Sequence, residues 1–214
     1  RAFGSQLAAR AWSLGLFAAP RKAFVGDGSS WIWTEWDRHF KAFGFVPILD
    51  FIHALTRVYA AALAGRSPTA GWEIYRRWIT WTWQGEVAKV IAELAARQQE
   101  LGLPTPPNHD TDGDTSPRSI VSETLTYLQN QQSRMNYPAY RKQGLPITSA
   151  HMESTVKLIN RRVKGSEKYW SETGAEDLLQ LTADHLSTSQ PMTHFWHSRP
   201  HQMTGTRSYA KSAN

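Results

Sequence analysis

The fold is decided by residues 23–53, which open with Ala23-Phe24-Val25-Gly26-Asp27-Gly28 and return to an apolar run at Phe45-Val46-Pro47-Ile48-Leu49-Asp50. Each run is short, apolar and followed by turn or capping residues, which is typical of a buried strand. Residues 29–41, between them, have the pattern of a helix. The order strand, helix, strand predicts an α/β fold with parallel strands. The proline in the second run favours a strand start or an edge strand.

Most of the chain outside this stretch has helical patterns. We expect helices over residues 1–20, 51–64, 72–101, 118–135 and 174–186, and a further helix that carries Glu153. Residues 102–117 are rich in Pro, Asp, Thr and Gly and predict a solvated loop. The pair Tyr137-Pro138 predicts a break followed by a loop. Residues 187–214 are polar, contain two prolines, and predict a flexible tail.

Composition narrows the functional classes. The chain has 214 residues, no cysteine and a formal net charge of +6. The absence of cysteine excludes disulfide scaffolds, thiol catalysis and cysteine-ligated zinc, and favours a reducing, cytoplasmic compartment. No apolar run approaches the roughly 18 residues that a membrane helix needs, so we expect no membrane association. The basic balance fits a polyanionic partner, although many soluble proteins carry such a charge without using it.

Two acidic residues follow the predicted strands. Asp27 lies between two glycines at the end of the first strand, where ligands bind in parallel α/β sheets. It is equally suited to cap the helix that begins near Ser29. Asp50 and His53 form Asp-x-x-His at the second strand end. They could bind a metal as a pair, or Asp50 could cap the helix beside a histidine packed in the core.

Glu153 begins a strongly basic helix. Met152, Val156, Ile159 and Val163 recur at helical spacing and predict a buried stripe. On a neighbouring face, Glu153 is followed by Lys157, Asn160, Arg161 and Lys164, and Arg162 adds to the basic region. Two interpretations stay open: an exposed ion pair between Glu153 and Lys157, or a metal-binding carboxylate whose basic neighbours contact phosphates.

Aromatic and histidine clusters give weaker signals. Trp78, Trp81 and Trp83 could stack on unpaired bases, but packing between helices is the more common use of such residues. His194, His197 and His201 have a spacing that could hold a metal, without an acidic or cysteine partner nearby.

Taken together, several motifs resemble bacterial insertion-sequence transposases of the DDE type, most similar to the Kra-type group and related to Mutator-like transposases. The matching residues lie between about 23 and 186 and comprise Phe24-Val25-Gly26-Asp27-Gly28-Ser29-Ser30-Trp31-Ile32-Trp33, Ile48-Leu49-Asp50-Phe51-Ile52-His53, Thr124-Leu125-Thr126-Tyr127-Leu128, Arg134-Met135-Asn136-Tyr137, Ile147-Thr148-Ser149-Ala150-His151-Met152-Glu153-Ser154, Asn160-Arg161-Arg162-Val163-Lys164-Gly165 and Trp170-Ser171. Their order and spacing make the resemblance more specific than any one motif.

The resemblance implies an incomplete RNase H-like (retroviral-integrase-type) catalytic core with a mostly helical insertion. Residues 1–64 would form the second half of the core, 65–146 the insertion, 147–186 the region of the catalytic Glu, and 187–214 a tail. Asp27 matches the second Asp of the triad and Glu153 its Glu, as ligands of two Mg²⁺ or Mn²⁺ ions that activate a water or a DNA 3′-hydroxyl. Asp50 and His53 match a supporting signature.

This resemblance also implies how the protein works. The expected activity is metal-dependent cleavage and strand transfer at insertion-sequence ends, by a homo-oligomer assembled on DNA and associated with the nucleoid. Lys157, Arg161, Arg162 and Lys164 would contact DNA. Alternatives are a non-catalytic DNA-binding protein, an inactive transposase remnant, or an RNase H-like nuclease unrelated to transposition.

Two departures from the family pattern stand out. Residues 1–26 contain no Asp or Glu, although the first Asp of the triad should precede Asp27. We therefore expect the chain to be the C-terminal part of a catalytic domain, with little or no activity alone. Thr182 replaces an arginine that is usual in the family.

Overall fold

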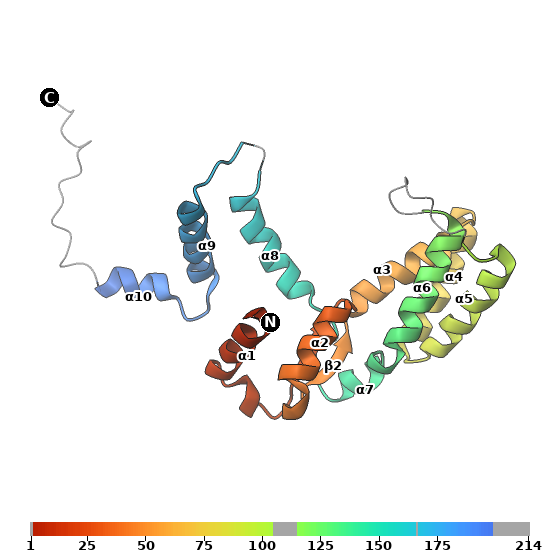
Figure 1. Ribbon diagram of the computed structural model, residues 1–214, viewed down its shortest axis with the longest axis horizontal. Coiled ribbons are helices and arrows are strands. Elements are labelled where there is room, and N and C mark those ends of the chain that lie inside the picture. The colour runs from red at the N-terminus through yellow and green to blue at the C-terminus, as the bar shows by residue number, and fades with distance from the viewer. Residues whose placement is uncertain (1, 105–114, 166, 199–214) are drawn as a thin grey trace. The chain divides into compact units, whose positions relative to one another are not determined.

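The computed structural model describes residues 2–104, 115–165 and 167–198 (Figure 1). The chain divides into two units, of which the first ends at Ala150 and the second begins at His151. The first unit is a mixture of helices and a small parallel sheet, and the described part of the second is helical. None of the described helices combines the length and the apolar character needed to cross a membrane.

The predicted parallel pair is present. Strands β1 (Ala23–Gly26) and β2 (Val46–Leu49) run parallel and in register, with Val25 opposite Ile48. Helix α2 (Ser30–His39) connects them, followed by the short 3₁₀ helix η2 (Lys41–Phe43). Within the described residues the sheet has only these two strands, so β2 lies at an edge, where Pro47 is tolerated. Both strands therefore end on the same side, immediately before Asp27 and Asp50.

Four helices pack beside the sheet and form most of the core (Figure 1). They are α3 (Phe51–Leu63), α4 (Pro68–Trp83), α5 (Val87–Leu101) and α6 (Pro117–Gln131). Both α4 and α6 begin with a serine cap followed by proline, a combination that favours helix initiation. Trp78 is buried among them, which confirms the packing interpretation for this residue, whereas Trp83 is exposed and contacts Arg141.

Three predicted boundaries in the first unit are wrong, for local reasons. The first helix, α1 (Ala2–Ser13), stops before Gly15, whose φ of +73° starts the 3₁₀ helix η1 (Leu16–Ala18). The helical stretch 72–101 is two helices, separated at Gly85. Tyr137-Pro138 begins helix α7 (Tyr137–Lys142) after the 3₁₀ helix η3 (Gln132–Arg134), because proline is compatible with a first helical turn.

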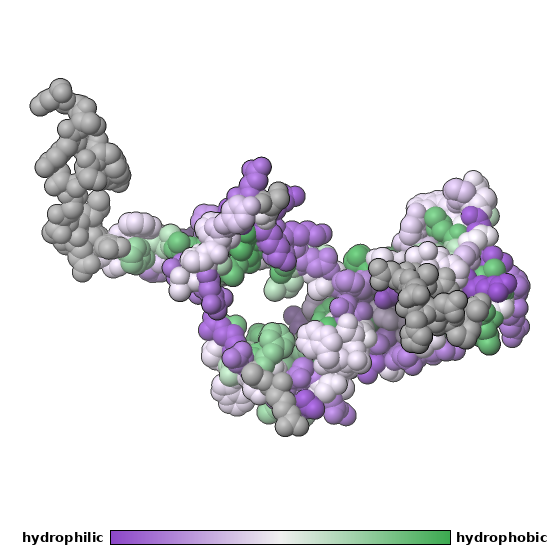
Figure 2. Space-filling view, turned by 45° about the horizontal axis from the view of Figure 1, so that its top comes forward, coloured by the Kyte–Doolittle hydropathy of each residue, from purple (hydrophilic) through white to green (hydrophobic). Residues whose placement is uncertain are grey.

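The second unit contains α8 (Ala150–Val163, whose first residue closes the first unit), α9 (Glu172–Leu186) and α10 (Pro191–Ser198). The expectation of a flexible tail from residue 187 onwards is wrong for residues 191–198, which form α10. Residues 199–214 of that tail, and residues 105–114 of the predicted loop, lie outside the described residues. The predicted buried stripe of α8 is also wrong, since no residue of that helix is buried and Met152 is 65% exposed. Figure 2 shows hydrophobic residues at the surface of this unit among hydrophilic ones.

Candidate active site

Asp27 directly follows β1 and is exposed. Its Oδ1 accepts a hydrogen bond of 2.8 Å from the backbone N–H of Ser29, which closes a tight turn. The N-cap position of α2 is Ser29 itself, so the helix-cap interpretation of Asp27 is wrong. The carboxylate stabilises the turn with one oxygen. Its other oxygen, Oδ2, has no hydrogen-bond partner among the described residues.

Helix α6 fixes this turn in place. The Tyr127 hydroxyl donates to the carbonyl oxygen of Asp27 at 2.8 Å, and the side-chain amide of Gln131 donates to the carbonyl of Gly28 at 3.0 Å. Gly28 has a φ of +100°, and a Cβ atom there would lie 2.6 Å from the Tyr127 ring. Only glycine fits both the backbone conformation and the close approach of that ring. The position of Asp27 is therefore set from a helix about a hundred residues away.

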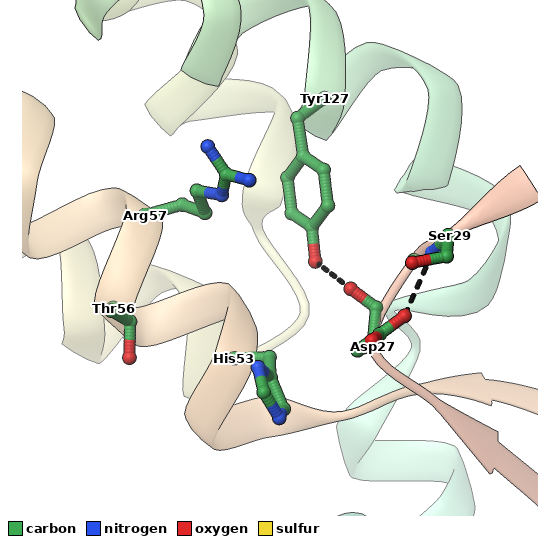
Figure 3. Close-up of a pocket in the computed structure, with 7 residues that line it drawn as sticks. Asp27, Ser29, His53, Thr56, Arg57 and Tyr127 are labelled. Atoms are coloured by element: carbon green, nitrogen blue, oxygen red, sulfur yellow. Dashed lines mark hydrogen bonds between the residues drawn. The ribbon is translucent and has the colours of Figure 1, made fainter. Parts of the chain in front are cut away.

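A cavity of about 240 Å³ opens beside Asp27, between the turn, α3 and α6 (Figure 3). His53, Thr56 and Arg57 border it from α3, and Tyr127 borders it from α6. Figure 3 shows Arg57 alongside the Tyr127 ring, and its guanidinium lies 5.5 Å from the ring centre. His53 is exposed at this cavity, so the interpretation as a packed core histidine is wrong. The structure thus brings Asp27 and His53 to one pocket.

Asp50 has a different environment, because it is completely buried. Its Oδ1 accepts from the backbone N–H groups of Ile52 and His53, at 2.8 and 3.0 Å, and so caps α3. Its Oδ2 accepts from the backbone N–H and the hydroxyl of Ser149. Burial by itself would raise the pKa of Asp50, but the hydrogen bonds from Ser149 and His53 outweigh it and hold that pKa below its ordinary value. Asp50 therefore ties the end of β2 to the residue that precedes α8.

Glu153 lies in the first turn of α8 and is half-buried. Lys157, Arg161 and Arg162 are exposed along the same helix, and Lys164 follows its end. The carbonyls of Arg161 and Arg162 accept from the Lys168 ammonium, which caps the helix instead of extending the basic face. Because Glu153 belongs to the second unit, its juxtaposition with Asp27 stays a prediction.

The residues at the cavity can be tested against the two divalent ions that the resemblance implies. The cavity is bordered by one carboxylate, Asp27, one imidazole, His53, and the cationic side chain of Arg57. Both oxygens of Asp50 are already hydrogen-bonded to protein donors. No group of three or more potential ligands occurs among the described residues, including His194 and His197, while His201 lies outside them. At this cavity the described residues of the first unit supply one carboxylate ligand. The two-metal site that the resemblance implies stays a prediction, because its other carboxylate, Glu153, belongs to the second unit.

Arg57 and Tyr127 line the pocket and Gln131 anchors its turn, and none of them was predicted as a site residue. Arg57 lies four residues after His53, so the two side chains share a face of α3, and this spacing could have indicated it. Tyr127 and Gln131 are also four residues apart, on α6. Their contact with the Asp27 turn had no local signal, because it joins distant parts of the chain.

Comparison with protein-family models, with curated proteins and with solved structures gives no match for this chain.

The Tyr127 phenol gives a prediction in the alkaline range. Burial, assisted by the Asp27 and Asp50 carboxylates and opposed by Arg57, raises the pKa of Tyr127 to about 12. Its contribution to stability is thus complete below its ordinary pKa of about 10 and is lost as the pH rises toward 12. We expect Tyr127→Phe to be about 1 kcal/mol less stable than wild type at pH 8, because it lacks the hydrogen bond to Asp27. Urea unfolding should show that this gap closes by about pH 11; a gap that is constant with pH would contradict the assignment.

Proposed function

We propose that this chain is part of the catalytic domain of a DDE-type transposase, an enzyme that cuts DNA and joins its ends by phosphoryl transfer, and that it has little or no activity alone. In this proposal β1, α2, β2 and α3 belong to an RNase H-like core, and the helices from α4 to α7 are an insertion in it. Asp27 and Glu153 are the acidic residues of the reaction, and the basic face of α8 binds DNA.

The observation that carries the proposal is the position of Asp27. It lies at the carboxyl end of a parallel strand, at an open cavity, with one carboxylate oxygen that accepts no hydrogen bond from the described residues. Ligands of open α/β sheets bind at this end of the strands. The order of the motifs around Asp27, Asp50 and Glu153 adds to this support.

A second candidate function, DNA binding without catalysis, is favoured by a specific observation. Only one carboxylate borders the cavity within the described residues, and an arginine borders it as well. A protein with this arrangement could bind phosphates without holding metal ions. The two candidates differ in whether divalent cations strengthen the binding of DNA.

The deciding experiment measures the affinity for a labelled DNA duplex by fluorescence anisotropy, in EDTA and in Ca²⁺. For a transposase we expect Ca²⁺ to strengthen binding about tenfold, equivalent to about 1.4 kcal/mol. Asp27→Asn and Glu153→Gln should each abolish this gain without weakening binding in EDTA, because they remove metal ligands and no phosphate contact.

Matched controls come from carboxylates in similar local settings. Asp37→Asn changes an exposed carboxylate on α2, and Glu172→Gln changes one in the first turn of α9, the position that Glu153 has in α8. Both should keep the full gain in Ca²⁺. Equal affinities in EDTA and Ca²⁺ for wild type and all variants would refute the transposase proposal and favour DNA binding alone.

A further inference from the structure

A second hollow continues from the cavity at Asp27 along α6. It has a volume of about 380 Å³ and shares Arg57 and Tyr127 with the first cavity. Its wall includes Ser122, Thr126 and Asn130, which recur every fourth residue and so form one stripe on the helix. We call this continuous feature the α6 groove. Its lining residues carry hydroxyl or amide groups at each turn, which suits a polar, extended ligand.

Arg57 lies where the two hollows meet. Its side chain is 53% exposed, and its guanidinium donates no hydrogen bond to another described residue. By contrast, Arg66, Arg134 and Arg141 each donate to backbone carbonyls. Contact with the Tyr127 ring holds the guanidinium in place without consuming its donors. Such a fixed, unsatisfied fork is suited to bind a phosphate.

Glu123 lines the second hollow and partly neutralises the charge of Arg57. Its Oε2 lies 3.8 Å from Nη1 of Arg57, a distance that allows attraction but is too long for a hydrogen bond. Its Oε1 accepts from the Ser119 hydroxyl at 3.1 Å, which holds the carboxylate on α6. Arg57 is therefore partly neutralised while its hydrogen-bonding capacity stays available.

The Tyr127 ring itself is not available as a stacking platform for a base. Arg57 lies against the ring, and the backbone at Gly28 approaches it so closely that a Cβ atom would clash with it. The groove thus offers the Arg57 cation, partly neutralised by Glu123, together with uncharged hydrogen-bonding groups, and no free aromatic face at this point. This chemistry recognises a sugar–phosphate backbone more readily than the bases.

We propose that the α6 groove binds the backbone of a single DNA strand and leads it to Asp27, with Arg57 contacting a phosphate. The inference rests on the proposed function in taking DNA as the ligand. It requires neither metal ions nor catalysis. The groove proposal can therefore be refuted while the transposase proposal stands, and the transposase proposal can be refuted while the groove proposal stands.

The test measures the affinity for a fluorescein-labelled single-stranded 12-nucleotide DNA in EDTA, as a function of salt. Loss of one phosphate contact on a single strand changes the slope of log K against log salt by about 0.7, which is roughly a fivefold loss of affinity at 0.1 M salt. We expect this result for Arg57→Ala. Arg57→Lys should retain most of the salt slope, because it keeps the charge and loses only the fork geometry.

A substitution of opposite sign separates binding from a structural effect. Glu123→Gln removes the charge that moderates Arg57 and should tighten binding by roughly two- to fivefold, the range expected for a partly exposed ion pair. A merely structural role of this pair would give losses from both changes.

The exposed ion pair Arg76–Glu73 provides the matched control. Its side chains are each 63% exposed, its atoms lie 3.4 Å apart, and neither residue lines the groove. Arg76→Ala and Glu73→Gln should each change the affinity by less than twofold, a bound set by the small energies of exposed pairs. The proposal is overturned if Arg57→Ala binds like wild type, if it weakens binding no more than Arg76→Ala, or if Glu123→Gln weakens binding. Circular dichroism of each variant establishes that the fold is retained.

Discussion

Asp50→Ala should lower the free energy of unfolding by about 3–5 kcal/mol, the largest effect expected for any polar residue described above. The substitution removes the side-chain cap of α3 and leaves the backbone N–H and hydroxyl of Ser149 without their acceptor at a completely buried position. A lost cap costs about 0.5–2 kcal/mol, and each buried donor left unsatisfied costs about 1–3 kcal/mol. Urea unfolding followed by circular dichroism measures the sum.

Asp50→Asn divides this effect into its two parts. The remaining side-chain oxygen can still cap α3, but the new amide N–H₂ group would face the two donors of Ser149. We therefore expect a loss intermediate between wild type and Asp50→Ala. The control is Asp37→Ala, which removes an exposed carboxylate paired with Lys41 and should cost no more than about 0.5 kcal/mol. Equal losses for Asp37→Ala and Asp50→Ala would refute the structural role of Asp50.

The same residue determines a response to acid. Because the pKa of Asp50 in the folded protein lies below its ordinary value, its stabilisation is present above about pH 4 and is lost as the pH falls through the folded-state pKa. The difference in unfolding free energy between wild type and Asp50→Asn should therefore shrink as the pH falls below about 5, which is about one unit above the ordinary pKa of an aspartate. A difference that is constant with pH would mean that the charge of Asp50 is not what Ser149 binds.

Gly28→Ala should destabilise the first unit by about 2–4 kcal/mol. The backbone at Gly28 has a φ of +100°, which costs any other residue about 1–2 kcal/mol or more. The new methyl group would also lie 2.6 Å from the Tyr127 ring and displace it, with loss of the hydrogen bond to Asp27. The expected result is a shift of the urea midpoint, accompanied by weaker binding of single-stranded DNA because Arg57 loses the ring that supports it.

Gly15→Ala is the matched control for the backbone cost. Gly15 also has a positive φ, of +73°, but nothing lies within 4 Å of a Cβ atom built there. Its substitution should cost only the conformational part, about 1–2 kcal/mol. The double variant Gly28→Ala/Tyr127→Ala should lose less stability than the sum of the two single losses, because the two residues are in contact and their effects are not additive. If Gly28→Ala costs no more than Gly15→Ala, the ring does not rest on the turn.

The elements that were predicted correctly have local signals. The apolar runs that became β1 and β2 are short and interrupted by turn residues, and the helix after Asp50 shows an apolar period over its whole length. Helix boundaries were harder to predict, because proline and glycine can begin, interrupt or end a helix depending on their position in it. Pro138 begins a helix where a break was expected, and Gly85 separates two helices where one was expected.

The pocket was only partly predictable, because half of it is built by distant contacts. Asp27 and His53 follow the two strands and were identified from that position. The bonds from Tyr127 to Asp27 and from Ser149 to Asp50 join residues about a hundred positions apart, and no local pattern encodes them. The prediction of a buried stripe on α8 was wrong for a related reason. An apolar period shows that a helix has an apolar face, but it does not show which other part of the protein, if any, packs against that face.

These two long-range bonds have a consequence for the order of events during protein synthesis. The Asp27 turn is made a hundred residues before the tyrosine that anchors it, and Asp50 is made 99 residues before Ser149. At about 5–20 residues per second, a ribosome needs roughly 5–20 s to produce each missing partner. During that interval the nascent chain can form its early helices, but it has neither the anchored turn nor the paired buried carboxylate. The pocket is therefore assembled last, after the helical region that separates its parts in the sequence has emerged.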